Sequence, residues 1–265
     1  MRTILFTKKS SAQIYCANYL FEKGILTDVV FEKGSSFRDS NIGFLKKISI
    51  YKNISWSFSF LFYKLLKLLN NNKYYGNEDY YNKKILVNNY EKLKDGLKLH
   101  EFNSVNDKGV LLLINKISPK FVFVFGTGMI KKQVINNINC PKINLHFGLS
   151  PFFRGEGIVS ALATEGPKSV GITIHYLDEK IDSGEIILQE VPEINNHDNF
   201  YSIGLKLTLL GASGFHKVFN SFKKNNIVSV KQDLSLGKLF DNKFMKNNQH
   251  FYFKAWKTLK KIKND

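Results

Sequence analysis

Cysteine is scarce in this chain, and its scarcity excludes two classes of protein. Only two cysteines, Cys16 and Cys140, occur among 265 residues, and neither belongs to a Cys-x-x-Cys pair. Two isolated thiols cannot build a disulfide framework or a cysteine-rich zinc site. We therefore expect a protein of a reducing compartment, stabilised by the buried core that a chain of this length is able to form.

Long apolar runs and internal repeats are also missing. The short apolar run at the start meets Lys8 and Lys9 before it could form the hydrophobic region of a signal peptide. The most apolar stretch, 54–69, is interrupted by serines and lysines and falls short of the roughly 20 apolar residues that a membrane-spanning helix requires. The sequence thus predicts a cytoplasmic protein with no membrane span.

Acidic residues are few, since 22 Asp and Glu face 39 Lys and Arg, and the formal net charge is +17. Such an excess can attract nucleic acid, acidic lipid or phosphorylated ligands. Nearly half of it lies in residues 223–265, where 11 lysines against 3 aspartates give a net charge of +8, and the rest is thinly spread. Because a stacking-aromatic motif of the RNA-binding type is absent, this distribution disfavours nucleic acid as a partner.

Strand and helix patterns alternate along the chain. The β-rich runs are residues 2–6, 26–31, 85–87, 121–125, 143–147, 169–176 and 185–190. The helical patterns are residues 11–23, 108–116, 129–137, 157–164 and 200–222. This order predicts an α/β fold with a parallel sheet and crossover helices. The run 121–125 is apolar throughout, as in a central strand covered on both faces.

Two segments depart from this alternation. Residues 34–82 form an aromatic-rich insertion with a leucine-rich helical run, and residues 223–265 form a basic extension. The extension contains a β-like piece at 227–230 and an amphipathic helical pattern at 250–262. We therefore expect a catalytic domain over residues 1–222 that includes the insertion, followed by the extension. Both segments are candidates for a homodimer contact.

Polar side chains interrupt two of the predicted strands. Asn144 and His146 project from one face of a strand while Leu145 faces the other way, and Thr173 and His175 repeat this arrangement. Asp182 follows in a polar loop. An amide, an imidazole and a carboxylate that converge at strand ends could donate a hydrogen bond, transfer a proton and orient the imidazole. Taken singly, each has an ordinary structural interpretation as a satisfied core histidine or a plain turn.

The combined string of motifs resembles the signature of the folate-dependent formyltransferases, which include glycinamide-ribonucleotide, methionyl-tRNA and nucleotide-sugar N-formyltransferases. The resemblance covers residues 110–190 clearly and the first 30 residues loosely. It implies a Rossmann-like, mostly parallel sheet, 10-formyltetrahydrofolate as co-substrate and no metal. The matching string is Asn144-x-His146-x-x-Leu149-Ser150-Pro151-x-x-Arg154-Gly155, then Gly171-x-Thr173-x-His175, then Asp182-x-Gly184.

The resemblance also implies roles for individual residues. Asn144, His146 and Asp182 would be catalytic, and Thr173 and His175 would support them. The pterin of the folate would lie between two loops, which contain Phe125, Gly126, Thr127, Gly128, Met129, Ile130, Leu177, Asp178 and Ile181. The acceptor side would include Ser150, Pro151, Arg154 and Gly155.

The acceptor is the least determined part of this interpretation. Many family members have Pro-Ser-Leu-Leu-Pro after the catalytic histidine, whereas residues 147–151 here are Phe-Gly-Leu-Ser-Pro. The favoured acceptor is the amine of a nucleotide-linked amino-dideoxy sugar for surface polysaccharide synthesis. Methionyl-tRNA comes second, because its enzymes carry a C-terminal β-barrel for which residues 223–265 are too few. Phosphoribosylglycinamide comes third, and the non-enzymatic alternative is a basic interaction protein that retains the fold.

Overall fold

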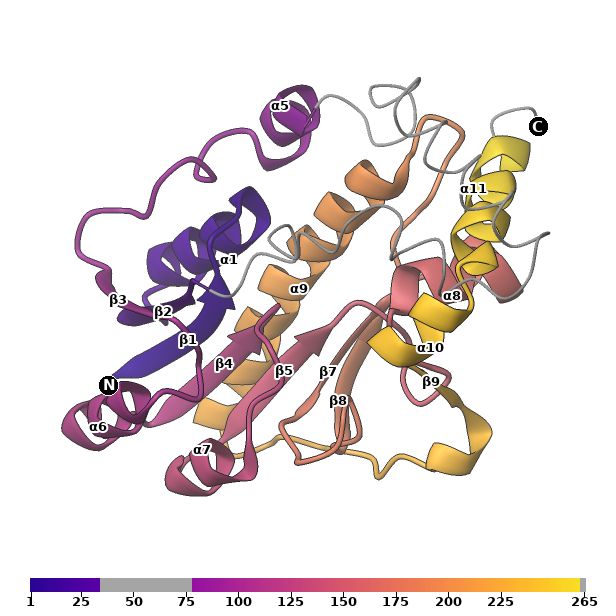
Figure 1. Cartoon of the computed structure of the whole chain (residues 1–265). Coiled ribbons are helices and arrows are strands. Elements are labelled where there is room, and N and C mark those ends of the chain that lie inside the picture. The colour runs from indigo at the N-terminus through magenta and orange to yellow at the C-terminus, as the bar shows by residue number, and fades with distance from the viewer. Residues whose placement is uncertain (34–77, 263–265) are drawn as a thin grey trace, which may run out of the picture.

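A computed structural model of the chain describes residues 1–33 and 78–262, and a seven-stranded sheet lies at its centre (Figure 1). The strand order is β3-β2-β1-β4-β5-β7-β8; β7 pairs antiparallel with both β5 and β8, and all other neighbouring strands pair in parallel. The predicted α/β fold with a mostly parallel sheet is confirmed. The strands are β1 (Thr3–Lys8), β2 (Asp28–Glu32), β3 (Lys98–Phe102), β4 (Phe121–Phe125), β5 (Lys142–His146), β7 (Ile172–Tyr176) and β8 (Ile186–Glu190).

Helices cover both faces of the sheet, which explains why β4 is apolar at every position. Phe121 and Phe123 pack on the face covered by α1 and α9, whereas Val122 and Val124 pack on the face covered by α6 and α7. Each fully buried side chain of this size stabilises the fold by about 1.5–3 kcal/mol. The helices are α1 (Ser11–Glu22), α6 (Lys108–Ile117), α7 (Lys132–Asn137) and α9 (Phe200–Lys223).

The order in which strands are added to the sheet reverses between β1 and β4. From β1 the chain proceeds to β2 and β3 on one side, and β4 begins the other side. The connections that follow β1 and β4 therefore diverge, and open α/β sheets bind ligands in the crevice that such divergence leaves at the carboxyl ends of the strands. Residues 8, 10–13 and 124–130 line a cleft at this point.

The C-terminal extension shares the core of the main body. Strand β9 (Lys238–Phe240) pairs in parallel with β6 (Phe153–Gly155), and α11 (His250–Ile262) packs against α8 (Gly157–Thr164). Helix α10 (Asn242–Asn247) lies between β9 and α11. The buried residues that the extension adds to the core are Phe240, Met245, Ala255 and Leu259. The domain boundary at residue 222 stays a prediction.

Several strand assignments differ from the sequence prediction: the short strands β6 and β9 were not predicted, and the predicted β-like piece at 227–230 contributes an isolated bridge through Val230. The predicted strand at 85–87 is wrong, because residues Asn82–Leu86 form a π-helical turn after α5 (Glu78–Tyr81), in which Leu86 packs against Leu205 of α9. Strand β3 was missed, since it lies at the sheet edge and its residues are only partly buried. The predicted aromatic insertion lies largely in residues 34–77, outside the described residues.

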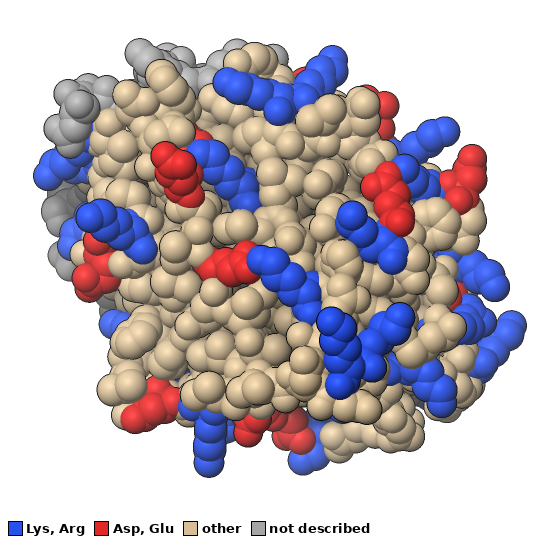
Figure 2. Space-filling model, turned by 180° about the vertical axis from the view of Figure 1, so that it is seen from behind, with Lys and Arg blue, Asp and Glu red and all other residues tan. Residues whose placement is uncertain are grey.

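Three further features bear on the sequence predictions: membrane spans, the two cysteines and the charged surface. Across residues 1–33 and 78–262, no helix is both long and apolar enough to cross a bilayer. Both cysteines are free, and burial raises the pKa of the Cys16 thiol to about 12, so this thiol is an unreactive part of the core. On the face in Figure 2, lysine and arginine side chains are interspersed with acidic ones.

Candidate active site

The cleft at the carboxyl edge of the sheet has a volume of about 810 Å³. It is formed by the ends of β1, β4 and β5, the loop before β8, the first turn of α8 and one side of α9. It brings together the three predicted catalytic residues and both predicted folate loops. The predicted residues that line it are Asn144, His146, Asp182, Gly155, Phe125, Gly126, Thr127, Gly128, Met129, Ile130, Leu177, Asp178 and Ile181.

Strand β5 places Asn144 and His146 on the cleft side. Between them Leu145 points to the opposite face and packs closely on α9, where a Cβ on Gly211 would overlap the leucine side chain. This close approach holds the strand against the helix. The Asn144 amide nitrogen lies 3.2 Å from Asp182 Oδ1 and 3.1 Å from His175 Nε2.

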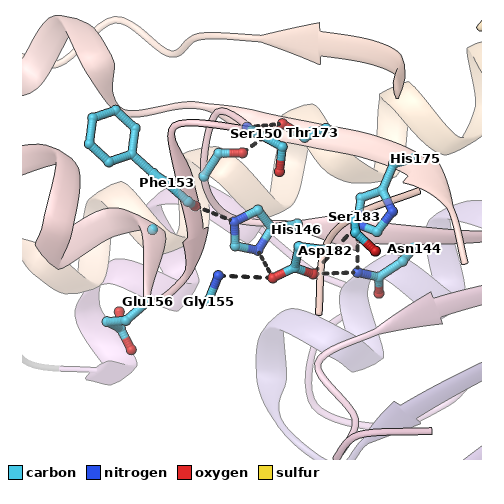
Figure 3. A network of polar contacts seen from close by, with 12 residues as sticks. Asn144, His146, Ser150, Phe153, Gly155, Glu156, Thr173, His175, Asp182 and Ser183 are labelled. Carbon is cyan, nitrogen blue, oxygen red and sulfur yellow. Dashed lines mark hydrogen bonds and ion pairs between the residues drawn. The ribbon is translucent and has the colours of Figure 1, made fainter. Parts of the chain in front are cut away.

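Asp182 connects the site, as Figure 3 shows. Its Oδ2 lies 3.2 Å from His146 Nδ1 and accepts a hydrogen bond of 2.9 Å from the Gly155 amide. The residue has a left-handed backbone with φ of 48°. Gly184, two residues later, has no side chain to obstruct the turn, where a Cβ would overlap the Tyr176 carbonyl oxygen. The loop is therefore shaped to aim one carboxylate at both β5 residues.

The two central groups influence each other's protonation. Burial alone would raise the pKa of Asp182, but the charge of His146 and the bonds from His175 and Gly155 lower that pKa to about 2. Burial lowers the pKa of His146, and the Asp182 carboxylate opposes that shift. His146 Nε2 lies 2.6 Å from the Phe153 carbonyl oxygen. Since both imidazole nitrogens face oxygen acceptors, only the imidazolium can donate to both.

His175 and Thr173, the predicted supporting residues, lie next to the predicted catalytic residues. His175 Nδ1 lies 2.8 Å from the Tyr176 carbonyl oxygen, and its Nε2 lies 3.1 Å from the Asn144 amide nitrogen and 3.5 Å from Asp182 Oδ1. Thr173 Oγ1 donates to the Gly148 carbonyl and accepts from the Ser150 amide. Gln189 on β8 also donates to Thr173 Oγ1, at 2.9 Å. These bonds fix the loop that follows His146.

Glycine at position 148 has a physical reason. A Cβ there would overlap the Phe153 carbonyl oxygen and His146 Nε2, so a side chain would separate the pair that now lies 2.6 Å apart. The glycine of the Phe-Gly-Leu-Ser-Pro sequence, which departs from the family pattern, thus allows the contact between His146 and the Phe153 carbonyl. The predicted acceptor residues Ser150, Pro151 and Arg154 are not among the described residues that line the cleft.

Glu32 braces one of the predicted folate loops and was missed in the sequence. This carboxylate is buried at the carboxyl end of β2, where Oε2 accepts from the Gly128 amide at 2.6 Å and Oε1 accepts from the Val105 amide at 3.2 Å. Ser104 Oγ donates to Oε1 at 3.3 Å. The sequence signal that could have indicated Glu32 is a single acidic residue at the carboxyl end of an apolar strand.

Replacement of Glu32 by alanine should lower the free energy of unfolding by about 1–3 kcal/mol, because two amides lose their acceptor. Glu32→Gln should have a smaller effect, since its oxygen can serve Val105 while its amide faces the Gly128 N–H. Urea unfolding measures the stability of both variants. Glu101→Ala serves as control, because the Glu101 carboxylate is partly exposed and pairs with the exposed Lys33. Equal stability of all four proteins would contradict this bracing role.

Other cleft residues carried no sequence signal. They come from the turn after β1, the start of α8, helix α9 and the residue pair after β9, and they converge only in the folded chain. They are Lys8, Ser10, Ser11, Gln13, Glu156, Ile158, Phe200, Tyr201, Gly204, Leu205, Thr208, Asp241 and Asn242. No group of three or more His, Cys, Asp or Glu placed to hold a metal occurs in the described parts of the chain.

The geometry agrees with comparison to known proteins. The sequence model of the formyl transferase family matches residues 68–219, more than half of the 265 residues. The chain belongs to the formyl transferase family. The predicted membership among folate-dependent formyltransferases is thus confirmed. A methionyl-tRNA formyltransferase of Fusobacterium nucleatum is 33% identical over 145 residues, 54% of this chain and 47% of that protein, so the chain spans about half the length of the curated relatives it matches.

Solved formyl transferase structures share the fold. A 4-N formyltransferase from Francisella tularensis superposes with a TM-score of 0.57 at 18% identity, covering 97% of this chain and 87% of that one. A formyltransferase from Anoxybacillus kamchatkensis, in complex with UDP-4,6-dideoxy-4-formamido-L-AltNAc and tetrahydrofolate, superposes with a TM-score of 0.51 at 22% identity, covering 63% of this chain and 88% of that one. At these identities the likeness concerns the fold.

Proposed function

We propose that this chain transfers the formyl group of 10-formyltetrahydrofolate to the amine of a nucleotide-linked amino-dideoxy sugar used in surface polysaccharide synthesis. The observation that carries the reaction type is the meeting of Asn144, His146 and Asp182 at the edge of one cleft. An amide donor, an imidazole and a buried carboxylate are the groups that formyl transfer to an amine requires.

The chemistry follows from these groups. The acceptor nitrogen bonds to the formyl carbon, the bond from that carbon to the folate nitrogen breaks, and the amine proton passes to that nitrogen through Asp182, His146 or water. Asn144 Nδ2–H and His146 Nε2–H would stabilise the oxyanion that forms between these events, at about 3–4 kcal/mol for a well-placed donor. Asp182 would favour the imidazolium.

The His146 and Asn144 donors contact other groups of the protein. His146 Nε2 lies against the Phe153 carbonyl, and the Asn144 amide lies between Asp182 and His175. In the substrate complex each donor would exchange one of these bonds for one to the formyl oxygen. Such tightening on binding is common in active sites.

The cleft fits a folate. Its two predicted pterin loops, residues 125–130 and 177–182, both contribute lining residues, and its volume lies in the usual range for a small-molecule site. The exposed pair of Lys132 with Glu179, at 2.9 Å, joins the start of α7 to the Asp182 loop. Backbone groups of the two loops would bind the pterin edge, and Ile130 and Leu177 would supply apolar contacts.

Two observations support a sugar nucleotide as acceptor. The fold superposes over 97% of this chain on a 4-N formyltransferase, and another fold neighbour holds a UDP-linked formamido sugar. Within the cleft, Lys8 and the N-terminus of α1 present positive charge, which suits a phosphate group. The Ser10 side chain makes no capping bond to α1, so the first amides of that helix are not used by it.

Methionyl-tRNA is the second candidate, because the curated relatives that match about half of this chain are methionyl-tRNA formyltransferases. Its acceptor is also an amine, so the catalytic residues would serve it equally. Phosphoribosylglycinamide is the third candidate acceptor. The three candidate acceptors differ in the group that carries the amine, and measurement of turnover with each of them distinguishes the candidates.

A panel of acceptors tests the proposal. The purified chain is incubated with 10-formyltetrahydrofolate and, separately, with several 3- and 4-amino-dideoxy sugar nucleotides, charged initiator tRNA and phosphoribosylglycinamide, and tetrahydrofolate release is followed. We expect turnover with a sugar nucleotide. Turnover with tRNA alone would overturn the sugar assignment, and the absence of turnover with every acceptor despite folate binding would favour a binding role.

A further inference from the structure

The loop that carries Asp182 is contacted from behind by the C-terminal extension. Gln232 is only 8% exposed, and its amide nitrogen donates to two carbonyl oxygens, that of Asp182 at 3.1 Å and that of Gly184 at 2.5 Å. A side-chain amide has two hydrogens, and these two carbonyls use both. The contact therefore spans the backbone on either side of Ser183.

Gln232 reaches the loop from an anchored segment. Two residues earlier, Val230 exchanges both backbone hydrogen bonds with Ile186 at the start of β8, each 2.8 Å long. Ser229 Oγ donates to the Glu185 carboxylate at 2.6 Å. Residues 229–232 thus run beside the chain that leaves the Asp182 loop, so the amide approaches the loop from a fixed neighbour.

The loop conformation needs such support. Asp182 has a left-handed φ of 48°, which is less favourable for aspartate than the right-handed region. A conformation of this kind persists where the surrounding structure constrains it from several sides. Its carboxylate must also meet His146 and the Gly155 amide at once. A small rotation of the loop backbone would separate it from one or both.

We propose that Gln232 is a positioning residue, which binds the Asp182 and Gly184 carbonyls and thereby keeps the Asp182 carboxylate against His146. The orientation of its amide follows from the contact, because the reverse orientation would set Oε1 against two carbonyl oxygens. Within the described residues Oε1 has no hydrogen-bond partner, so the donor half of the amide makes the contact. The consequence for turnover rests on the proposed function, whereas the geometric claim does not.

Gln232→Met tests the proposal, since methionine has similar length and volume but no donor. We expect kcat to fall about 10- to 100-fold, because displacement of a reacting group by about 1 Å has costs of that order. The KM for both substrates should change little, since Gln232 is not among the described residues that line the cleft. In NMR titrations the His146 imidazole should lose its proton at lower pH than in the wild type, because Asp182 is then less firmly held beside it. His175 also faces this pair, with its Nε2 3.5 Å from Asp182 Oδ1.

Two further variants complete the experiment. Asp233→Ala alters the neighbouring residue, whose carboxylate bonds to Ser235 alone among the residues that the structure describes, and should behave as wild type. Gln232→Asn retains the amide one methylene short and should lose part of the activity; it carries the test if the methionine variant does not fold. Unchanged kcat and an unchanged His146 titration in a folded variant would overturn the proposal. If the wild type formylates no acceptor, the proposed function fails, while the titrations still decide the role of Gln232.

Discussion

His146→Ala should lower kcat for formyl transfer by about 10²–10⁴-fold, the range that a positioned proton-transfer group contributes. The imidazole is 6% exposed, lies at the edge of the cleft and has both nitrogens within hydrogen-bond distance of oxygen atoms. Its Nδ1 is paired with Asp182 Oδ2, whereas the other β5 side chain in the site, Asn144, contacts Oδ1. Initial rates of tetrahydrofolate release, measured with the acceptor that the panel identifies, give the effect.

The matched control is His197→Ala. His197 is exposed in the loop before α9, and its backbone amide bonds to Asn195 Oδ1, so replacement of its side chain tests for a general effect of losing a histidine. We expect wild-type rates from this control. A His146→Ala protein that binds folate, shows a wild-type circular dichroism spectrum and turns over at more than a tenth of the wild-type rate would refute the assignment of His146.

Asp182→Asn should have a comparable effect on kcat, because asparagine keeps the shape of the side chain but removes the charge that favours the imidazolium. General acid–base catalysis contributes about 10²–10⁴-fold to the rate, and the substitution should remove this contribution. Asparagine also presents an NH₂ group either at the Oδ2 position, which faces His146 and the Gly155 amide, or at the Oδ1 position, to which the Asn144 amide donates. Asp233→Asn, at an exposed position away from the cleft, serves as the control. Wild-type kcat in Asp182→Asn would exclude a catalytic carboxylate at this position.

The same substitution should change how stability depends on pH. The pKa of Asp182 is lowered from 3.8 to about 2, so its ionised form stabilises the folded state fully above the unfolded pKa, and this contribution is lost as pH falls through about 2. The difference between these two pKa values corresponds to about 2 kcal/mol in the free energy of unfolding. Urea unfolding at about pH 5 and pH 2 should therefore show a smaller loss in Asp182→Asn than in the wild type. Equal losses would contradict the lowered pKa.

Local periodicity predicted much of the fold and part of the site. The alternation in β5 correctly places Asn144 and His146 together, and the unbroken apolar run of β4 correctly indicates a strand covered on both faces. Asp182 could be associated with them only through the family resemblance, because its loop reads as an ordinary turn. Strand β3 was missed, since an edge strand with partly exposed residues has no clear alternation.

The positioning residues could not be predicted because they act across long sequence distances. Gln232 is separated from Asp182 by 50 positions and occurs as an isolated glutamine in a lysine-rich tail. Glu32 is separated from Gly128 by 96 positions. Each forms hydrogen bonds to backbone atoms, which exist at every residue and leave no mark in the sequence of the partner. Only the three-dimensional arrangement identifies such pairs.

The pairing of β6 with β9 has a consequence for biosynthesis. Gly155 lies in β6 and supplies an amide to Asp182, and its partner in β9 is Phe240. During translation residue 155 leaves the ribosome long before residue 240, so the nascent chain holds most of the parallel sheet while one edge of the cleft is still unpaired. Catalytic competence should therefore appear late and abruptly as synthesis proceeds, after the bulk of the fold is in place.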